Sequence, residues 1–130
     1  MKSLLVMLLV AMPLAHEAPI PAKIVAPEPV ILLGTASYYG EEWTLGHGHR
    51  GIMANGKPFN PRALTAASYD IPLGTHVLVY NMLNDREIEV IITDRGPKRK
   101  LNRLIDLSQA AARRLGYIHR GTTLVVVTMK

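Results

Sequence analysis

The middle of the chain carries the clearest alternation of apolar and polar residues. Over residues 87–92, Glu87 and Glu89 face one way, while the aliphatic residues Ile88, Val90 and Ile92 face the other. This period of two predicts a half-buried strand. Residues 75–81 alternate in the same way around Val77 and Val79. Turn-forming residues at Asn84-Asp85 separate the two segments. The chain is therefore expected to reverse direction between two strands.

Three further segments are rich in residues that favour strands, namely Val30–Tyr39, Leu64–Ala67 and Leu124–Thr128. We expect roughly six short strands within about 100 residues, which is one small domain with a single core. An open sheet of this size would expose two unpaired edges, whereas a closed barrel exposes none. The pattern therefore predicts a mainly β fold, a small closed six-stranded barrel with one short helix.

The one segment with a strong helix signature is Ser108–Leu115. Ser108 is a favourable N-cap, and three alanines within the segment favour helix. Arg113 and Arg114 complement the dipole at the C-terminal end, and Gly116 is a favourable stop. We expect the single helix here.

The N-terminal part of the chain differs in composition from the rest. Lys2 precedes the apolar run Leu4–Leu14, which is typical of a signal peptide and shorter than the roughly 20 residues that cross a bilayer. Four prolines between residues 19 and 29 indicate an extended linker. We therefore assign 1–18 as a signal peptide, 19–32 as a Pro-rich linker and 33–130 as the barrel domain. This predicts a secreted or periplasmic protein without stable membrane insertion.

Composition and charge narrow the chemistry. The chain has no cysteine, which excludes disulfides, thiolate metal sites, a cysteine nucleophile and lipid attachment through cysteine. A formal net charge of +5 suits an acidic polymer such as bacterial cell wall, but it suits nucleic acid or an uncharged partner equally. No motif that reads a nucleic-acid groove is present, so we expect no nucleic-acid partner. Nothing in the sequence indicates an oligomer, and a monomer is assumed.

Two carboxylates, Asp94 and Asp106, each follow an apolar run. An acid at the end of a rigid element is held in place while open to a ligand, as general acid catalysis requires. The alternatives are structural: Asp94 caps the turn after it, and Asp106 sits favourably near a helix N-terminus. The basic segment Lys98–Arg103 between them either binds carboxylates or phosphates of the cell wall, or is an ordinary solvated loop.

Six short blocks, taken in order, resemble the rare lipoprotein A family. They are Gly34-Thr35-Ala36-Ser37-Tyr38-Tyr39-Gly40, Met53-Ala54-Asn55-Gly56, Ala63-Leu64-Thr65-Ala66-Ala67, Leu73-Gly74-Thr75, Thr93-Asp94-Arg95-Gly96-Pro97 and Ile105-Asp106-Leu107-Ser108. Each block alone is common, whereas the ordered set is specific and spans nearly all of the expected domain. The resemblance implies a double-psi β-barrel, the fold shared with expansins and barwin-like proteins.

The resemblance also implies an activity. Family members cut peptidoglycan glycan strands without water and without a cofactor, leaving 1,6-anhydro-muramic ends. By resemblance, Asp94 is the catalytic acid and base, and Asp106 assists it. The expected substrate-binding residues are Ser37, Tyr39, Asn55, Gly56, Ser68 and Arg95. For Ser37 a plain strand serine is an open alternative, as is a simple tight turn for Asn55-Gly56.

Three positions depart from the family pattern. Lys57, Asn60 and Ser68 stand where members tend to have Glu, Asp and His. The leading hypothesis is therefore a lytic transglycosylase that acts on peptidoglycan. The rivals are a non-catalytic, expansin-like module that binds peptidoglycan, and a barwin-type inhibitor that binds a protein.

Aromatic and histidine residues complete the list of candidates. Tyr38, Tyr39 and Trp43 are candidates for a platform that stacks on sugar rings, although Tyr38 and Tyr39 cannot both face one groove on a strand. His47 and His49 lack nearby third and fourth ligands in the sequence, so we expect no metal site.

Overall fold

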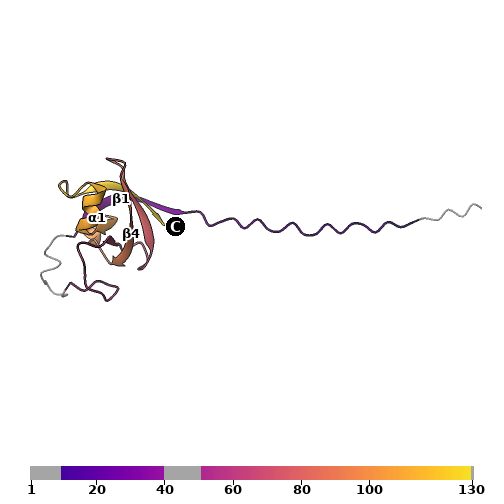
Figure 1. The fold of residues 1–130 in the computed structure, drawn as a ribbon, viewed down its shortest axis with the longest axis horizontal. Coiled ribbons are helices and arrows are strands. Elements are labelled where there is room, and N and C mark those ends of the chain that lie inside the picture. The colour runs from indigo at the N-terminus through magenta and orange to yellow at the C-terminus, as the bar shows by residue number, and fades with distance from the viewer. Residues whose placement is uncertain (1–9, 40–50, 130) are drawn as a thin grey trace, which may run out of the picture.

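Six strands close into a barrel in the spatial order β1-β5-β2-β4-β3-β6. Figure 1 shows the barrel at one end of the extended N-terminal segment. The computed structural model describes residues 10–39 and 51–129. The strands are β1 Val30–Tyr38, β2 Thr65–Ala67, β3 His76–Asn81, β4 Glu87–Asp94, β5 Ile105–Leu107 and β6 Thr123–Met129; the helices are α1 Gln109–Leu115 and the 3₁₀ turn η2 Arg99–Leu101. The predicted mainly β, closed six-stranded barrel with one short α-helix is confirmed for the described residues.

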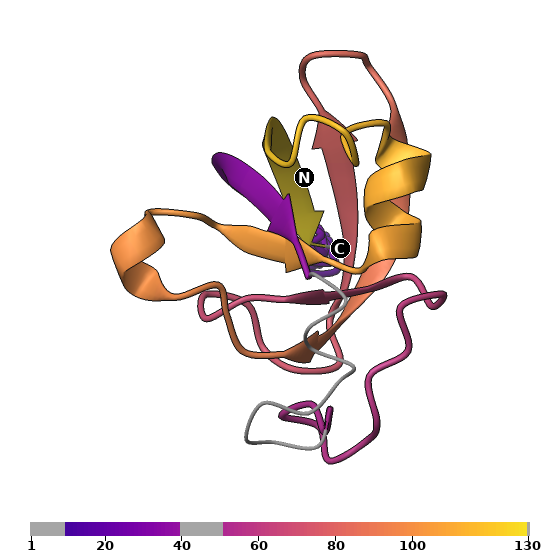
Figure 2. The same ribbon diagram turned by 90° about the vertical axis from the view of Figure 1, so that its left-hand side faces the viewer.

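Two of the strand pairs are parallel. β1 pairs in parallel with β5, and β2 pairs in parallel with β4, while the other neighbours are antiparallel. Figure 2 shows α1 against one side of the barrel and the segment that leads into β2 below it. Parallel neighbours leave the sheet at the same edge, so the segments that follow β2 and β4 lie side by side. This edge carries the site described below.

The barrel is filled by alternate residues of its strands. Val77 and Val79 of β3, and Val90 and Ile92 of β4, are buried with residues of the other strands and of α1. The alternation predicted for these two strands is therefore confirmed. The sequence did not delimit β5, because three residues are too few to show a period.

The helix begins and ends where its sequence predicts. The Ser108 hydroxyl accepts a hydrogen bond from the Ala111 amide at 3.2 Å and donates one to the Ala63 carbonyl at 2.6 Å. Gly116 ends the helix with a φ of 83°, a conformation that glycine adopts without strain. Ser108 thus both caps α1 and ties it to the segment before β2.

The N-terminal segment forms no helix or strand over residues 10–29, and β1 begins at Val30, three residues before the predicted domain boundary. Residues 1–9 of the predicted signal peptide lie outside the described residues, as do Trp43, His47 and His49. Among the residues described, no helix is long and apolar enough to cross a membrane.

Replacing Ser108 should test the double role of this cap. We expect Ser108→Ala to lower the free energy of unfolding by about 1–3 kcal/mol, because it removes the cap and leaves the Ala63 carbonyl without its donor. Urea unfolding followed by circular dichroism measures the change. Gln109→Ala, one residue later, keeps the cap and serves as the control. Equal stability of the two variants would contradict the assignment.

Tyr117 should make the barrel sensitive to alkali. Its side chain is only 2% exposed, and its hydroxyl donates to the Ser37 carbonyl at 2.7 Å. Burial, followed by the nearby Asp106 carboxylate, raises the pKa of Tyr117 above its ordinary value near 10. The unfolded chain therefore loses this proton first as pH rises, so stability is retained below about pH 10 and falls above it.

Tyr117→Phe removes the ionisable group, so its stability should fall less steeply than that of the parent between about pH 9 and pH 11. Urea unfolding at several pH values measures the slope, with Tyr69→Phe as the exposed-tyrosine control. Parallel curves for the parent and Tyr117→Phe would show that Tyr117 is not the source of the loss.

Candidate active site

The two predicted acids lie in one row across the barrel wall. Asp94 of β4 and Asp106 of β5 are both register partners of Ala67, which lies on β2 between them, and Asp106 is in turn the partner of Ser37 on β1. Register partners on neighbouring strands project to the same side of a sheet. We call Asp94, Ala67, Asp106 and Ser37 the acid row. The structure therefore brings both carboxylates to one face, as the sequence analysis required.

A register shift is what turns Asp94 toward this face. Ala66 pairs with Ile92, yet the next residue, Ala67, pairs with Asp94, so Thr93 is the additional residue. Without the shift, Asp94 would point to the same side as Ile92, which is the core side. Irregularities of this kind re-aim side chains next to active sites. No feature of the sequence pattern predicted this one.

The two oxygens of Asp94 have different surroundings. Oδ1 accepts hydrogen bonds from the backbone amides of Ala54 and Arg95, both at 2.8 Å. Oδ2 is buried and has no hydrogen-bond partner among the described residues, and the residue as a whole is 5% exposed. A buried polar atom without a partner is rare in native structures. One oxygen thus orients the carboxyl group, while the other is buried and has no hydrogen-bond partner among the described residues.

The Ala54 amide reaches Asp94 because of the Asn55-Gly56 turn. Gly56 has a φ of 82°, and its amide donates to the Met53 carbonyl at 2.9 Å. The Asn55 amide donates to the Thr93 carbonyl at 3.1 Å, which fixes the turn on β4. The tight turn that we considered for Asn55-Gly56 is thus present. Its contribution to the site is a backbone group, for which a sequence carries no residue-type signal.

Asp106 has a side-chain partner within the row. The Ser37 hydroxyl donates to Asp106 Oδ1 at 2.9 Å, so Ser37 is more than a plain strand serine. Tyr39 lies beside both acids: it is 3% exposed, and its ring packs edge-on against Phe59 at 5.0 Å between centroids. Burial, then the charges of Asp94 and Asp106, raise the pKa of Tyr39, so its hydroxyl stays protonated. Both carboxylates therefore act on one phenol.

Ser68 and Arg95 hydrogen-bond to the surrounding backbone. Ser68 is fully buried; its hydroxyl donates to the Leu104 carbonyl at 3.2 Å and accepts from the Asp70 amide at 3.2 Å. Nη1 of Arg95 donates to the carbonyls of Ser68 and Ile71 at 2.7 and 2.6 Å. Ser68 thus holds the surrounding backbone in place, and its assignment as a substrate-binding residue stays a prediction.

The remaining candidates are also accounted for. Tyr38 packs edge-on against Tyr117, and its hydroxyl donates to the Ile118 carbonyl at 3.0 Å, so neither Tyr38 nor Tyr39 offers an exposed ring. Lys57 and Asn60 line a pocket of about 390 Å³ beside the turn. Residues 10–39 and 51–129 contain no group of three potential metal ligands.

Comparisons with known proteins identify the family of this chain. The family model described as lytic transglycolase matches residues 32–127. The chain is 43% identical over 109 residues to the probable endolytic peptidoglycan transglycosylase RlpA of Nostoc sp., a match that covers 83% of this chain and 28% of that protein. The chain thus spans less than a third of the length of this curated relative.

Two solved structures share the fold at lower identity. The Streptomyces papain inhibitor has a TM-score of 0.58 at 24% identity, covering 78% of this chain and 96% of its own. The apo expansin of Clavibacter michiganensis has a TM-score of 0.56 at 21% identity, covering 78% of this chain and 50% of its own. These likenesses concern the fold alone. The family model and the sequence relative together establish that this chain belongs to the lytic transglycolase family, as a double-psi β-barrel of the rare lipoprotein A type.

Proposed function

We propose that this barrel is a peptidoglycan lytic transglycosylase that cleaves glycan strands and leaves 1,6-anhydro-muramic ends. The observation that carries the proposal is the pair of environments at Asp94, with one oxygen fixed by two amides and the other without a partner. Membership of the lytic transglycolase family supports the same activity.

The chemistry needs one carboxyl group. Protonated Oδ2 of Asp94 donates its proton to the glycosidic oxygen, and the bond between that oxygen and the anomeric carbon breaks. The C6 hydroxyl of the muramic unit then attacks the same carbon, and its proton returns to Oδ2. No water enters, so the second carboxylate that an inverting hydrolase uses to position water is not required. The two amide donors on Oδ1 keep the group oriented through both steps.

Asp106 is assigned a supporting role. The positive charge that develops on the sugar ring is stabilised by a carboxylate fixed on the same face, and Ser37 holds that carboxylate in position. Tyr39 contributes a hydroxyl that stays protonated between the two acids. The acid row thus supplies a proton donor, a negative charge and a neutral donor.

The second candidate function is non-catalytic, expansin-like binding of peptidoglycan. One observation favours it: Lys57, Asn60 and Ser68 stand where family members tend to have Glu, Asp and His. For either function we propose an extracytoplasmic location, secreted or periplasmic, reached through residues 1–18 as a signal peptide, with peptidoglycan as partner.

Asp94→Asn should abolish cleavage. The amide keeps an oxygen for the Ala54 and Arg95 donors but cannot transfer a proton, so we expect a loss of roughly 100-fold to 10,000-fold in turnover. Digestion of purified wall sacculi followed by mass spectrometry measures the 1,6-anhydro ends. Asp85→Asn, on the exposed β3–β4 turn, is the matched control. Anhydro ends that persist in Asp94→Asn would defeat the assignment.

Asp106→Asn should weaken cleavage less. It preserves the oxygen that accepts from Ser37 but removes the negative charge, so we expect turnover to fall roughly 10- to 100-fold, equivalent to about 1.4–2.7 kcal/mol of the barrier. Initial rates of release at several sacculus concentrations separate turnover from binding. A rate equal to that of the parent would remove Asp106 from the mechanism. Binding of sacculi without any product, in the parent as in both variants, would establish the non-catalytic alternative.

A further inference from the structure

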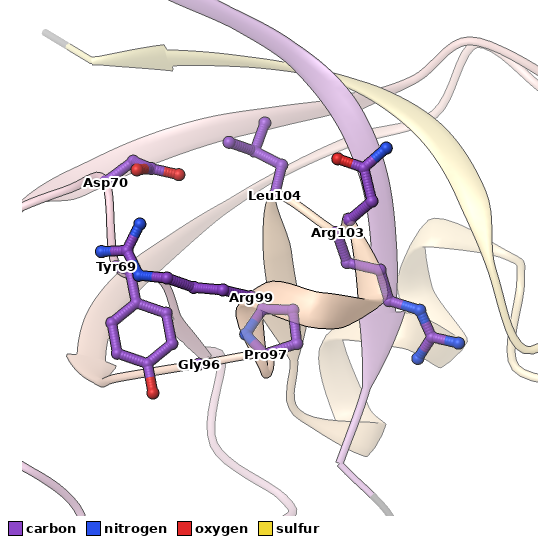
Figure 3. A pocket seen from close by; sticks show the side chains of 8 residues that line it. Tyr69, Asp70, Gly96, Pro97, Arg99, Arg103 and Leu104 are labelled. Carbon is purple, nitrogen blue, oxygen red and sulfur yellow. The ribbon is translucent and has the colours of Figure 1, made fainter.

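A pocket of about 170 Å³ adjoins the acid row where β2 and β4 end (Figure 3). One wall is Tyr69 and Asp70, which follow Ala67 at the end of β2; the other is part of residues 96–104, which begin two positions after Asp94. Because β2 and β4 are parallel, both walls leave the sheet at the same edge. Asp94 does not line the pocket, but both walls begin two residues after a member of the acid row, Ala67 or Asp94.

The first wall is held rigidly against β4. Nη1 of Arg95 donates to the carbonyls of Ser68 and Ile71, which flank Tyr69 and Asp70 on either side. The Ser68 amide donates to the carbonyl of Asp94 at 3.1 Å. The backbone that carries the two pocket residues is thereby fixed to the strand that carries the acid.

The same serine joins the two walls. Its hydroxyl donates to the carbonyl of Leu104 on the second wall and accepts from the amide of Asp70 on the first. Binding sites work best when buried groups fix the residues that contact the ligand. Ser68 and Arg95, which we expected to touch substrate, do not line this pocket but hold its two walls in place.

Tyr69 presents its ring at the pocket. It is 44% exposed, and the guanidinium carbon of Arg99 lies 4.8 Å from the ring centroid. Figure 3 shows Arg99 extended toward Tyr69 and Asp70, while the guanidinium of Arg103 points away from them. A cation over a ring face is attracted to it and orients the ring. The structure thus provides the exposed aromatic that Tyr38 and Tyr39 do not.

We propose that Tyr69 and Arg99 form a carbohydrate subsite that takes one N-acetylated pyranose unit of the glycan, next to the unit at Asp94. The C–H bonds on one face of a pyranose carry a small positive charge and pack on the negative face of an aromatic ring. Asp70 accepts from sugar hydroxyls, and the Arg99 guanidinium donates to an acetamido carbonyl. The proposal rests on the glycan substrate proposed above, though not on its cleavage.

The charges of the pocket favour a sugar over a phosphate polymer. Among the residues described, no acid lies within ion-pair distance of the basic side chains of Lys98–Arg103, which alone would suit an anion. Asp70, however, lines the same pocket and repels phosphate. A neutral sugar suits both residues, because its hydroxyls donate to Asp70 and its acetamido carbonyl accepts from Arg99.

The test measures binding separately from cleavage. A four-unit oligomer of N-acetylglucosamine is titrated into the full chain carrying Asp94→Asn, with isothermal calorimetry and amide chemical shifts as readouts. Adding Tyr69→Ala to the Asp94→Asn protein should raise the dissociation constant of the oligomer roughly tenfold. Tyr69→Phe keeps the ring face, so its dissociation constant should stay within about twofold of the value for the Asp94→Asn protein. For Arg99→Ala, we expect a dissociation constant between those of Tyr69→Phe and Tyr69→Ala. Tyr80→Ala on β3, away from the pocket, should bind as the Asp94→Asn protein does.

Three outcomes would overturn the subsite. The first is no binding of the oligomer, and the second is equal affinity with and without Tyr69→Ala. The third is weaker binding by Lys98→Ala and Arg99→Ala without weaker binding by Tyr69→Ala. The last would mean that charge rather than stacking holds the ligand. Failure here leaves the cleavage proposal standing if the parent still releases anhydro ends. Conversely, weaker binding by Tyr69→Ala with no anhydro ends from the parent would place the subsite on a non-catalytic barrel.

Discussion

The site depends on the one-residue register shift between Ala66 and Ala67 where β2 pairs with β4. Side chains alternate along a strand, so this shift decides whether Asp94 lies with Ile92 in the core or with Asp106 on the outer face. A carboxylate turned into the apolar core would lose the amides of Ala54 and Arg95 that now hold it. The shift therefore unites the two acids and also makes the burial of one of them tolerable.

Two residues near this shift serve to fix the backbone of the site. Arg95 and Ser68 use their polar atoms on backbone carbonyls and an amide, and they fix the segment 68–71 and the second pocket wall at once. A small hydroxyl suits the fully buried position of Ser68, where family members tend to have the larger His. In contrast, Asp94 Oδ2 is buried without a hydrogen-bond partner among the described residues, and the Tyr69 side chain is 44% exposed.

The fold alone does not select a function. The same barrel occurs in a papain inhibitor and in an expansin, both at identities that speak only for architecture. What distinguishes this chain is the chemistry of a few side chains at the edge where β2 and β4 end. An oriented acid beside an exposed aromatic is an arrangement suited to a sugar chain, and it follows from parallel strands that deliver their following segments to one place.

The sequence by itself determined most of the elements and marked two acids as candidates. Alternation fixed β3 and β4, capping fixed α1, and the position of Asp94 and Asp106 after apolar runs marked them as candidates, because these signals are local. Only the tertiary structure decided which groups surround them. The Ala54 amide arrives from a turn 40 residues before Asp94, and Tyr117, 80 residues after Ser37, donates to its carbonyl. Burial of Tyr39 and exposure of Tyr69 likewise depend on how distant segments pack, and neither residue type reveals this in advance.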